Sequence, residues 1–436
     1  MNLAGRRVAI VGLGTSGVAA AKLCGARGAV VTGFDEAPEG RLSDAARALD
    51  IEIVCGPLSR ASLSKSETVV VSPGVPRHPA LELDVEVIGE VELASRFVTA
   101  PIALVGGTNG KSTVTALVGD MLERSGQRVF VGGNYGVPFC DAIDEEHDAL
   151  VVEISSFQAE RVPTLRARVH ALLNISEDHL DRYDDFDDYA CAKGNPFANM
   201  AQEEVAVIPA RDAACEIQAR RGTARHVTFA IDGAADVALT DEAIVTRRDR
   251  FERRRIRLRG RHNLANACAA IAVATELGAS SRAIADTLAN FAGLPHRAAF
   301  VASHGGVAFY DDSKATNVGA AVAALSGLEE QRVVLIAGGR DKRGAYEPLA
   351  EALRRKGRGL VLIGEAAEHI AAVAVGIVPI HRADSMEEAV SAAATMAQSG
   401  DAVLLSPACS SFDMFASYKA RGESFVRSVA ALGGSS

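Results

Sequence analysis

The chain has 436 residues, of which 48% are hydrophobic and 23% charged, and its formal net charge is −9. These values predict a globular protein of about two to four domains and argue against wholesale nucleic-acid binding. No apolar run reaches the roughly 18 residues that a membrane-spanning helix needs. The seven cysteines form no CxxC pair and the N-terminus lacks a signal-peptide pattern, so we expect reduced thiols and a cytoplasmic location.

The first block of the chain, residues 1–96, alternates short apolar strands with helical sequence. Strands are expected at residues 7–11, 29–34 and 68–71, and a helix over residues 18–27. Such alternation is typical of a parallel sheet with crossover helices, so we predict a Rossmann-like α/β domain.

A glycine turn joins the first strand to the first helix. Gly12, Gly14 and Gly17 fit the pattern G-x-G-x-x-G, and Asp35 ends the next strand. Alone, this fingerprint suggests a nicotinamide- or flavin-dependent dehydrogenase, although glycines that serve only helix–strand packing give the same pattern. The next block carries a second phosphate-binding loop, of the ATP type, which a dehydrogenase does not need. We therefore interpret the first block as a nucleotide-recognising domain without a redox role.

The second block, residues 97–296, has the apolar runs of buried parallel strands. These strands are expected at residues 102–105, 128–131, 149–154, 170–175 and 205–209. An alternating pattern over residues 227–258 predicts a small antiparallel appendage, and helical sequence follows at 263–277 and 281–291. The third block, residues 297–436, predicts another Rossmann-like α/β domain, with strands at residues 307–310, 333–336, 360–363 and 403–405.

A strand, a glycine loop and a helix open the second block. The loop contains Gly110, Lys111 and Ser112 in the order that a P-loop requires. In such a loop the backbone N–H groups and the helix dipole bind phosphate oxygens, the lysine reaches the terminal phosphates and the hydroxyl holds Mg²⁺. Val105 stands where the strict P-loop pattern has its first glycine. We therefore expect this segment to be a shortened P-loop that binds ATP in the central domain.

Two strand ends near this loop carry polar residues that suit Mg²⁺. Glu153 ends the strand expected at 149–154, and a polar segment over residues 174–182 follows the next strand. Within that segment His179 is the better ligand candidate, because the acids around it are typical of a solvated loop. Lys193 lies in a helical pattern that Gly-Asn-Pro should end early, and the pattern alone does not single it out.

Seven segments together resemble the Mur ligases. They are GTNGKST at 107–113, EISSFQ at 153–158, NISEDHLDRY at 174–183, GRHNLANA at 260–267, LPHR at 294–297, DDSKATN at 311–317 and SPACSSFDMF at 406–415. The resemblance runs from residue 12 to about residue 425. The last two segments discriminate best, and they are similar to those of family members that add D-glutamate to UDP-N-acetylmuramoyl-L-alanine in peptidoglycan synthesis.

This resemblance implies three domains that bind, in order, the UDP substrate, ATP and the incoming amino acid. It implies an enzyme that uses ATP and two Mg²⁺ ions to form an acyl phosphate. The sequence gives no support for an oligomer interface, so we expect a monomer. Catalytic roles would fall on Lys111, His179 and Lys193, with Lys193 carried as a carbamate. The metal ions would be held by Ser112, Glu153, His179 and the modified Lys193.

The remaining implied roles fall on three sets of residues. The ATP set is Gly107, Thr108, Asn109, Gly110, Lys111, Ser112, Thr113, Asn266, Arg297, Asp312 and Lys314. The set for the UDP substrate is Thr15, Ser16, Asp35, Gly74 and Asn134. The D-glutamate set is Thr316, Lys342, Ser411 and Tyr418. Thr15 and Tyr418 depart from the family pattern, in which leucine and phenylalanine are expected.

Other functions fit parts of the sequence. A sister Mur ligase or a folylpolyglutamate synthase would use the same chemistry with another amino acid. A dehydrogenase would depend on the first glycine turn alone. A P-loop NTPase acting as a switch or scaffold would hydrolyse ATP without any dependence on an amino acid.

Overall fold

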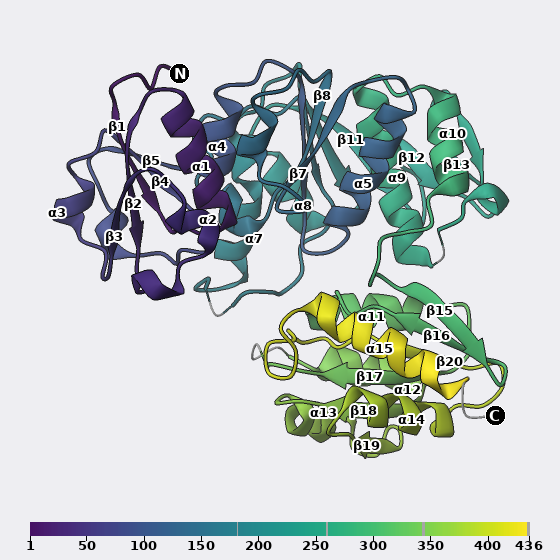
Figure 1. Cartoon of the computed structure of the whole chain (residues 1–436). Helices are drawn as coiled ribbons and strands as arrows, with labels where there is room; N and C mark the ends of the chain where they lie inside the picture. The colour runs from purple at the N-terminus through teal and green to yellow at the C-terminus, as the bar shows by residue number, and fades with distance from the viewer. Residues whose placement is uncertain (181, 259, 342–344, 434–436) are drawn as a thin grey trace. The chain divides into compact units, whose positions relative to one another are not determined.

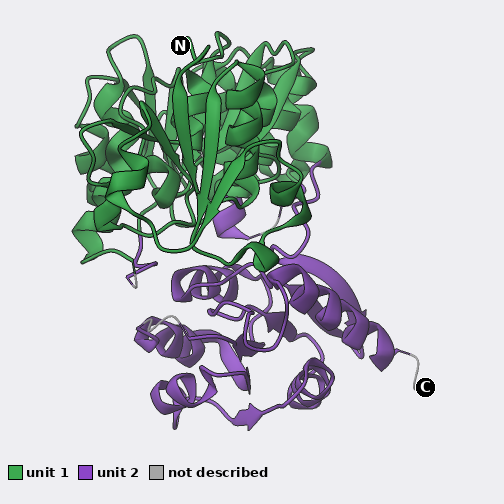
Figure 2. Cartoon of the chain, turned by 60° about the vertical axis from the view of Figure 1, so that its left-hand side comes forward, with its two compact units in different colours: residues 1–175, 182–256, 265–290 green, residues 176–181, 257–264, 291–436 purple. Residues whose placement is uncertain are grey.

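The computed structural model describes residues 1–180, 182–258, 260–341 and 345–433, and within these ranges the strands form three sheets (Figure 1). The chain divides into two compact units (Figure 2). The first comprises residues 1–175, 182–256 and 265–290, and the second comprises residues 176–181, 257–264 and 291–436. The first unit holds the first two sheets and the second unit holds the third.

The first sheet is parallel, in the order β3-β2-β1-β4-β5. Its strands are β1 (Arg7–Val11), β2 (Val30–Asp35), β3 (Glu52–Cys55), β4 (Thr68–Val71) and β5 (Glu86–Gly89). The helices of this region are α1 (Thr15–Ala26), α2 (Asp44–Arg47), α3 (Arg60–Leu63) and α4 (Glu90–Ser95), with 3₁₀ turns η1 (Glu39–Arg41) and η2 (Pro79–Leu81). Because strand side chains alternate between faces, Val8 and Ile10 pack with α1 and α4, whereas Ala9 and Val11 pack with α3 and η2.

The central sheet has the order β14-β13-β12-β11-β10-β9-β6-β8-β7. Its strands are β6 (Ile102–Gly106), β7 (Val129–Gly133), β8 (Ala149–Glu153), β9 (Val169–Leu172), β10 (Val205–Pro209), β11 (Arg225–Ala230), β12 (Val237–Leu239), β13 (Ala243–Val245) and β14 (Arg250–Glu252). The accompanying helices are α5 (Lys111–Glu123), α6 (Ser156–Ala159), α7 (Phe186–Gly194), α8 (Ala213–Ala219), α9 (Arg261–Glu276) and α10 (Ser281–Asn290), with 3₁₀ turns η3 (Phe139–Ala142) and η4 (Asn195–Asn199). The helix that carries Lys193 ends at Gly194, as the Gly-Asn-Pro sequence predicts.

The alternating segment extends one edge of the central sheet and contains the small antiparallel part that the sequence predicts. β11 pairs in parallel with β10 and with β12, and only the β12–β13 and β13–β14 pairs are antiparallel. Within this segment, residues 253–255 form the 3₁₀ turn η5 (Arg253–Arg255). The arginines there are exposed, so no buried face stabilises an extended strand.

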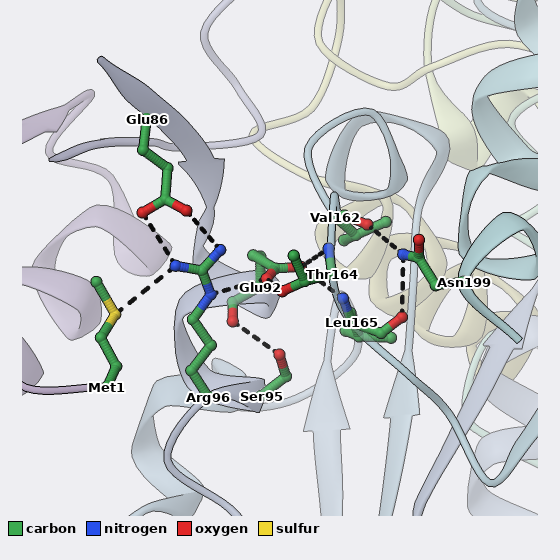
Figure 3. Close-up of polar contacts among 9 residues, drawn as sticks. All are labelled: Met1, Glu86, Glu92, Ser95, Arg96, Val162, Thr164, Leu165 and Asn199. Carbon is green, nitrogen blue, oxygen red and sulfur yellow. Dashed lines mark hydrogen bonds and ion pairs between the residues drawn. The ribbon is translucent and has the colours of Figure 1, made fainter.

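A buried carboxylate joins the first and central sheets within the first unit (Figure 3). Glu92 on α4 is fully buried and accepts hydrogen bonds from Leu165 N (2.9 Å), from Thr164 N (3.1 Å) and from the Thr164 hydroxyl. Arg96 Nε donates a fourth bond at 2.8 Å, and the Arg96 guanidinium also contacts both carboxylate oxygens of Glu86. The charge of Glu92 is thus compensated where α4 meets the loop after α6.

The third sheet has the order β15-β16-β20-β17-β18-β19, and only β15 and β16 pair antiparallel. Its strands are β15 (Ala299–His304), β16 (Val307–Asp311), β17 (Val333–Gly338), β18 (Gly357–Ile363), β19 (Ile380–Arg382) and β20 (Ala402–Leu405). The helices are α11 (Val318–Gly327), α12 (Glu347–Lys356), α13 (Ala367–Ala374), α14 (Met386–Met396) and α15 (Tyr418–Leu432). No helix in the described part of the chain is long and apolar enough to cross a membrane.

Candidate active site

The glycine turn after β1 shapes a cleft of about 460 Å³ in the first unit. Gly12 adopts a φ of +83°, a left-handed conformation that glycine tolerates. A Cβ atom on Gly17 would lie 1.9 Å from the carbonyl oxygen of Gly12, so only glycine lets α1 approach the strand end this closely. The cleft is lined by Thr15, Ser16, Asp35 and Gly74, which are four of the five residues predicted to meet the UDP substrate.

Asp35 fixes the shape of this turn. Its Oδ2 accepts a hydrogen bond from Leu13 N at 2.7 Å, and its Oδ1 accepts one from Ala37 N at 2.9 Å. Ser72 Oγ also donates to the carbonyl oxygen of Gly12 at 2.6 Å. The cleft is therefore preformed, and no side chain caps the N-terminus of α1 at Gly14, which leaves that helix end suited to an anionic ligand group.

The P-loop sequence forms the expected strand–loop–helix unit between β6 and α5. Gly107 and Gly110 have φ values of +135° and +88°, so the loop uses two conformations that side chains rarely adopt. Lys111 Nζ folds back and donates to the carbonyl oxygens of Gly107 and Thr108, at 2.8 Å each. A Cβ atom on Gly110 would lie 2.3 Å from Asn266 Oδ1, which places Asn266 of α9 directly against the loop.

An asparagine outside the predicted set fixes the loop from the other side. Asn174, just beyond β9, accepts a hydrogen bond from Asn109 N at 2.9 Å and donates one to the Asn109 carbonyl at 3.0 Å. The carbonyl oxygen of Asn174 also accepts from Thr108 N at 3.0 Å. These bonds satisfy backbone groups that the irregular loop would otherwise leave unpaired.

Lys193 reaches the P-loop from α7. It is buried, and its Nζ donates to the carbonyl oxygen of Gly107 at 2.8 Å, the same oxygen that Lys111 contacts. Its Nζ also lies 4.6 Å from the ring centroid of Tyr189, whose hydroxyl is 3.0 Å from Thr108 Oγ1. The structure thus brings two lysines, separate in the sequence, to one carbonyl of the phosphate-binding loop.

Glu153 occupies the strand end beside this loop, because β8 pairs with β6 and places Glu153 opposite Val105. Its side chain is buried, and Oε1 accepts a hydrogen bond from Asn134 Nδ2 at 2.6 Å. No described residue donates a hydrogen bond to Oε2. A buried carboxylate oxygen without a donor suits a hard cation such as Mg²⁺. Among described residues no cluster of three or more His, Cys, Asp or Glu side chains forms a metal site.

His179 lies in the segment 176–181, which belongs to the second unit. Its φ is +57°, an uncommon conformation for a residue with a side chain. Asp178 supports this conformation, because its Oδ1 accepts from His179 N at 3.0 Å while its Oδ2 accepts from Asn317 Nδ2 at 3.0 Å. The backbone at His179 is therefore held by a residue of the DDSKATN segment.

The same segment organises the remaining predicted residues of the second unit. Asp312 is buried, and its carboxylate accepts hydrogen bonds from Ser406 Oγ at 2.8 Å and from Ala298 N at 3.1 Å. Burial raises the pKa of Asp312 to about 7, against the hydrogen bonds that lower it. Lys314 Nζ lies 4.1 Å from the ring centroid of Tyr418, which brings one nucleotide candidate to one D-glutamate candidate.

The burial of four further predicted residues is also defined. Ser112, Thr113 and Ser411 are buried, and Thr316 is partly buried. Arg297 lowers the pKa of Asp312 through its charge. Lys342 lies outside the described residues.

Three family models cover most of the chain. The Mur ligase MurD-like N-terminal domain matches residues 6–89, the Mur ligase middle domain matches residues 105–274, and the Mur ligase glutamate ligase domain matches residues 296–409. Two relatives are named UDP-N-acetylmuramoylalanine–D-glutamate ligase. The one from Desulfosudis oleivorans is 44% identical over 98% of this chain and 96% of its own length, and the one from Syntrophotalea carbinolica is 41% identical over 99% and 98%.

The chain belongs to the Mur ligase family. The family prediction and the three-domain α/β architecture are therefore confirmed. Solved structures share the fold: MurF ligase from Thermotoga maritima, in complex with ADP, has a TM-score of 0.64 and 18% identity over 98% of this chain and 96% of that one. MurC from T. maritima has a TM-score of 0.60 and 20% identity over 99% of this chain and 100% of that one.

Sequence reasoning missed one residue that this Mur ligase buries completely. Arg421 on α15 donates hydrogen bonds to the carbonyl oxygens of Ser313 (2.8 Å), Cys409 (3.1 Å) and Ser410 (3.3 Å), and to Ser313 Oγ (3.0 Å). Burial lowers its pKa to about 10. One guanidinium thus ties the DDSKATN segment to the SPACSSFDMF segment. An arginine on an amphipathic helix gives no local signal of such a role.

Proposed function

We propose that the chain joins D-glutamate to UDP-N-acetylmuramoyl-L-alanine and converts ATP to ADP and phosphate. The observation that carries this proposal is the 44% identity, over 98% of the chain, to a relative that bears the name of this ligase. The two segments of this chain that best distinguish ligases adding D-glutamate are 311–317 and 406–415. Both belong to the second unit, where Arg421 bonds to each of them.

The proposed reaction begins with transfer of the γ-phosphoryl group of ATP to the carboxylate of the L-alanine residue. The amine of D-glutamate then attacks the acyl phosphate, the new amide bond forms and phosphate leaves. Lys111 and the N–H groups of the 107–113 loop would hold the phosphates, for which Lys111 must exchange its bonds to loop carbonyls for bonds to the nucleotide. Asn266 would contact the nucleotide near the loop, and Arg297, Asp312 and Lys314 are also assigned to the nucleotide.

Mg²⁺ would be held by Ser112, Glu153, His179 and, if it is carbamylated, Lys193, with two ions expected. When bound, these ions would neutralise charge on the phosphates and on the acyl intermediate. Glu153 is the member whose surroundings fit best, since its Oε2 has no donor among the described residues. Asn134, bonded to Glu153, would orient that carboxylate and contact the substrate.

A carbamate on Lys193 would replace a cation at the Gly107 carbonyl with an anion suited to Mg²⁺. The free amine must first lose its proton. Tyr189 and Thr108 enclose this position, and they would restrict the carbamate to one orientation.

The UDP moiety would occupy the cleft of the first sheet, with its diphosphate toward the N-terminus of α1 and contacts from Thr15, Ser16, Asp35 and Gly74. D-Glutamate would be held by Thr316, Lys342, Ser411 and Tyr418. The substrate carries two carboxylates, so hydroxyl donors and a lysine cation match its charge. The proposed domains are 1–96 for the UDP substrate, 97–296 for ATP and 297–436 for the amino acid, in a cytoplasmic monomer.

Phosphate release tests this proposal. Purified protein would be given Mg-ATP and UDP-N-acetylmuramoyl-L-alanine, with D-glutamate, L-glutamate or another amino acid. We expect release that requires both the UDP precursor and D-glutamate. Release with a different amino acid would indicate a sister ligase or a folylpolyglutamate synthase-like enzyme. Hydrolysis that no amino acid stimulates would favour a switch or scaffold.

A further inference from the structure

A second cavity in the first unit is lined by residues other than those of the cleft after β1. Its volume is about 210 Å³, and its walls include Arg77, Glu160, Arg161, Asp188, Cys191 and Asn195. These residues come from the loop after β4, from the end of α6, and from α7 and η4. None of them has a role in the proposed reaction.

Two ion pairs include three of the four charged residues that line this cavity, namely Arg77, Asp188 and Glu160. Arg77 donates from both terminal nitrogens to Asp188, at 2.7 and 2.9 Å. Arg182 pairs with Glu160 at 3.1 Å, and these two side chains are only 11% and 8% exposed. Each pair is close to neutral, so neither attracts an additional ion strongly.

Arg161 is the charged residue of the cavity lining that belongs to neither ion pair. It is partly buried, and no described residue accepts a hydrogen bond from its guanidinium or forms an ion pair with it. Burial lowers the pKa of Arg161, and the charges of Arg182 and Arg77 lower it further, while Glu160 opposes them. A guanidinium has five N–H donors, and leaving them without acceptors in a partly buried site costs free energy.

Glu160 has a carboxylate oxygen that needs a hydrogen-bond donor. Its Oε2 bonds to Arg182, but its Oε1 is buried without a donor among the described residues. The cavity therefore offers a forked cation without an acceptor and a carboxylate oxygen without a donor. A carboxylate would match the Arg161 fork, and a hydroxyl would match Glu160. The two ion pairs cancel, so the single uncompensated charge calls for a monoanion.

We propose that this cavity binds a small, singly charged hydroxycarboxylate. The carboxylate pairs with Arg161, and the hydroxyl donates to Glu160 Oε1. The cavity has room for a molecule of several heavy atoms. This site is independent of the proposed ligase reaction, since it uses none of the residues assigned to that reaction.

Thermal unfolding of the full chain tests the site, because a ligand that binds only the folded state raises Tm. Lactate is the probe, propionate is the analogue without the hydroxyl, and sodium chloride matches the ionic strength. We expect lactate to raise Tm more than propionate, and propionate more than chloride. Arg161→Gln should weaken lactate binding about tenfold or more, because a tenfold change corresponds to the loss of one charge-assisted hydrogen bond. Arg282→Gln, at a side chain 92% exposed on α10, is the matched control and should respond like the wild type.

Arg161→Gln also has an expected effect without ligand: its Tm should rise, because the uncompensated charge is gone. If that variant does not fold, Arg161→Lys keeps the charge without the fork and should still weaken lactate binding. Equal effects of lactate and chloride on the wild type would overturn the proposal. So would an undiminished response to lactate in a folded Arg161 variant.

Discussion

Removing the carboxylate of Glu92 should destabilise the first unit strongly. In Glu92→Ala, the backbone N–H groups of Thr164 and Leu165 and the Thr164 hydroxyl lose their acceptor in a fully buried position. A buried donor left without a partner costs about 1–3 kcal/mol. Arg96 keeps its bonds to Glu86, so its charge is not abandoned. Three buried donors would each be left without an acceptor, so we expect a loss of roughly 3–5 kcal/mol.

Two variants in the same network give graded controls (Figure 3). Thr164→Val removes only the hydroxyl donor to Glu92, so it should cost about 1 kcal/mol. Glu86→Ala removes the outer partner of Arg96. The Glu86 side chain is 41% exposed, so solvent screens the pair and the loss should be less than about 1 kcal/mol. The order of the three losses follows from burial and not from the number of charges removed.

Urea unfolding followed by circular dichroism measures these differences, and the chain has no tryptophan to report them by fluorescence. A change in the midpoint at constant slope reports stability. A loss for Glu92→Ala no larger than that for Glu86→Ala would contradict this prediction, since it would mean that the buried donors find other acceptors or water.

Three further predictions concern single side chains. Burial raises the pKa of Glu90 from 4.5 to about 7, so its stabilising contribution is complete below pH 4.5 and is lost as the pH rises through 7. Glu90→Gln should therefore be more stable than the wild type by roughly 3 kcal/mol at pH 8, and thermal unfolding across pH 5–8 should show the two curves converge at low pH. Lys193→Ala should be nearly inactive and partly rescued by short carboxylates, as phosphate release would show; normal Mg²⁺ dependence without rescue would count against a carbamate. Arg421→Ala should raise the KM for D-glutamate, with Arg421→Lys restoring little, because the compact ammonium cannot reach acceptors that are spread around the planar guanidinium; unchanged kinetics would exclude this positioning role.

The buried strands could be predicted from the sequence, whereas four strands at sheet edges could not. β6, β8 and β17 are continuous apolar runs that are buried along their length. β3 and β19 are short edge strands whose residues are largely exposed, so they lack both the apolar run and a full alternation. β5 and β15, the other edges of the first and third sheets, were also not predicted.

The glycine loops show what a local pattern can predict. The backbone conformation of each loop depends on residues that are neighbours in the chain. The glycines at positions 12 and 110 therefore predicted tight turns, and both residues adopt positive φ angles in the structure. The partners of these loops come from elsewhere. Asn174 holds the P-loop from a distance of 65 residues in the sequence, and no spacing rule indicates that pairing.

The positions of Lys193 and Arg421 illustrate the same limit. Lys193 contacts a residue 86 positions away, and a lone lysine on a helix is usually solvated. Only the resemblance to a known family assigned it a role. Arg421 received none, because its partners lie up to 108 positions away and become neighbours only when the third sheet forms.

The central claim is the formation of one amide bond per ATP consumed, and mass spectrometry of the product tests it most directly. The protein would be incubated with Mg-ATP, UDP-N-acetylmuramoyl-L-alanine and isotopically labelled D-glutamate, with labelled L-glutamate in a parallel reaction. We predict a UDP-linked product that carries the label from D-glutamate alone, in equal amount to the phosphate released. Phosphate released without labelled product, or equal labelling from both enantiomers, would contradict it.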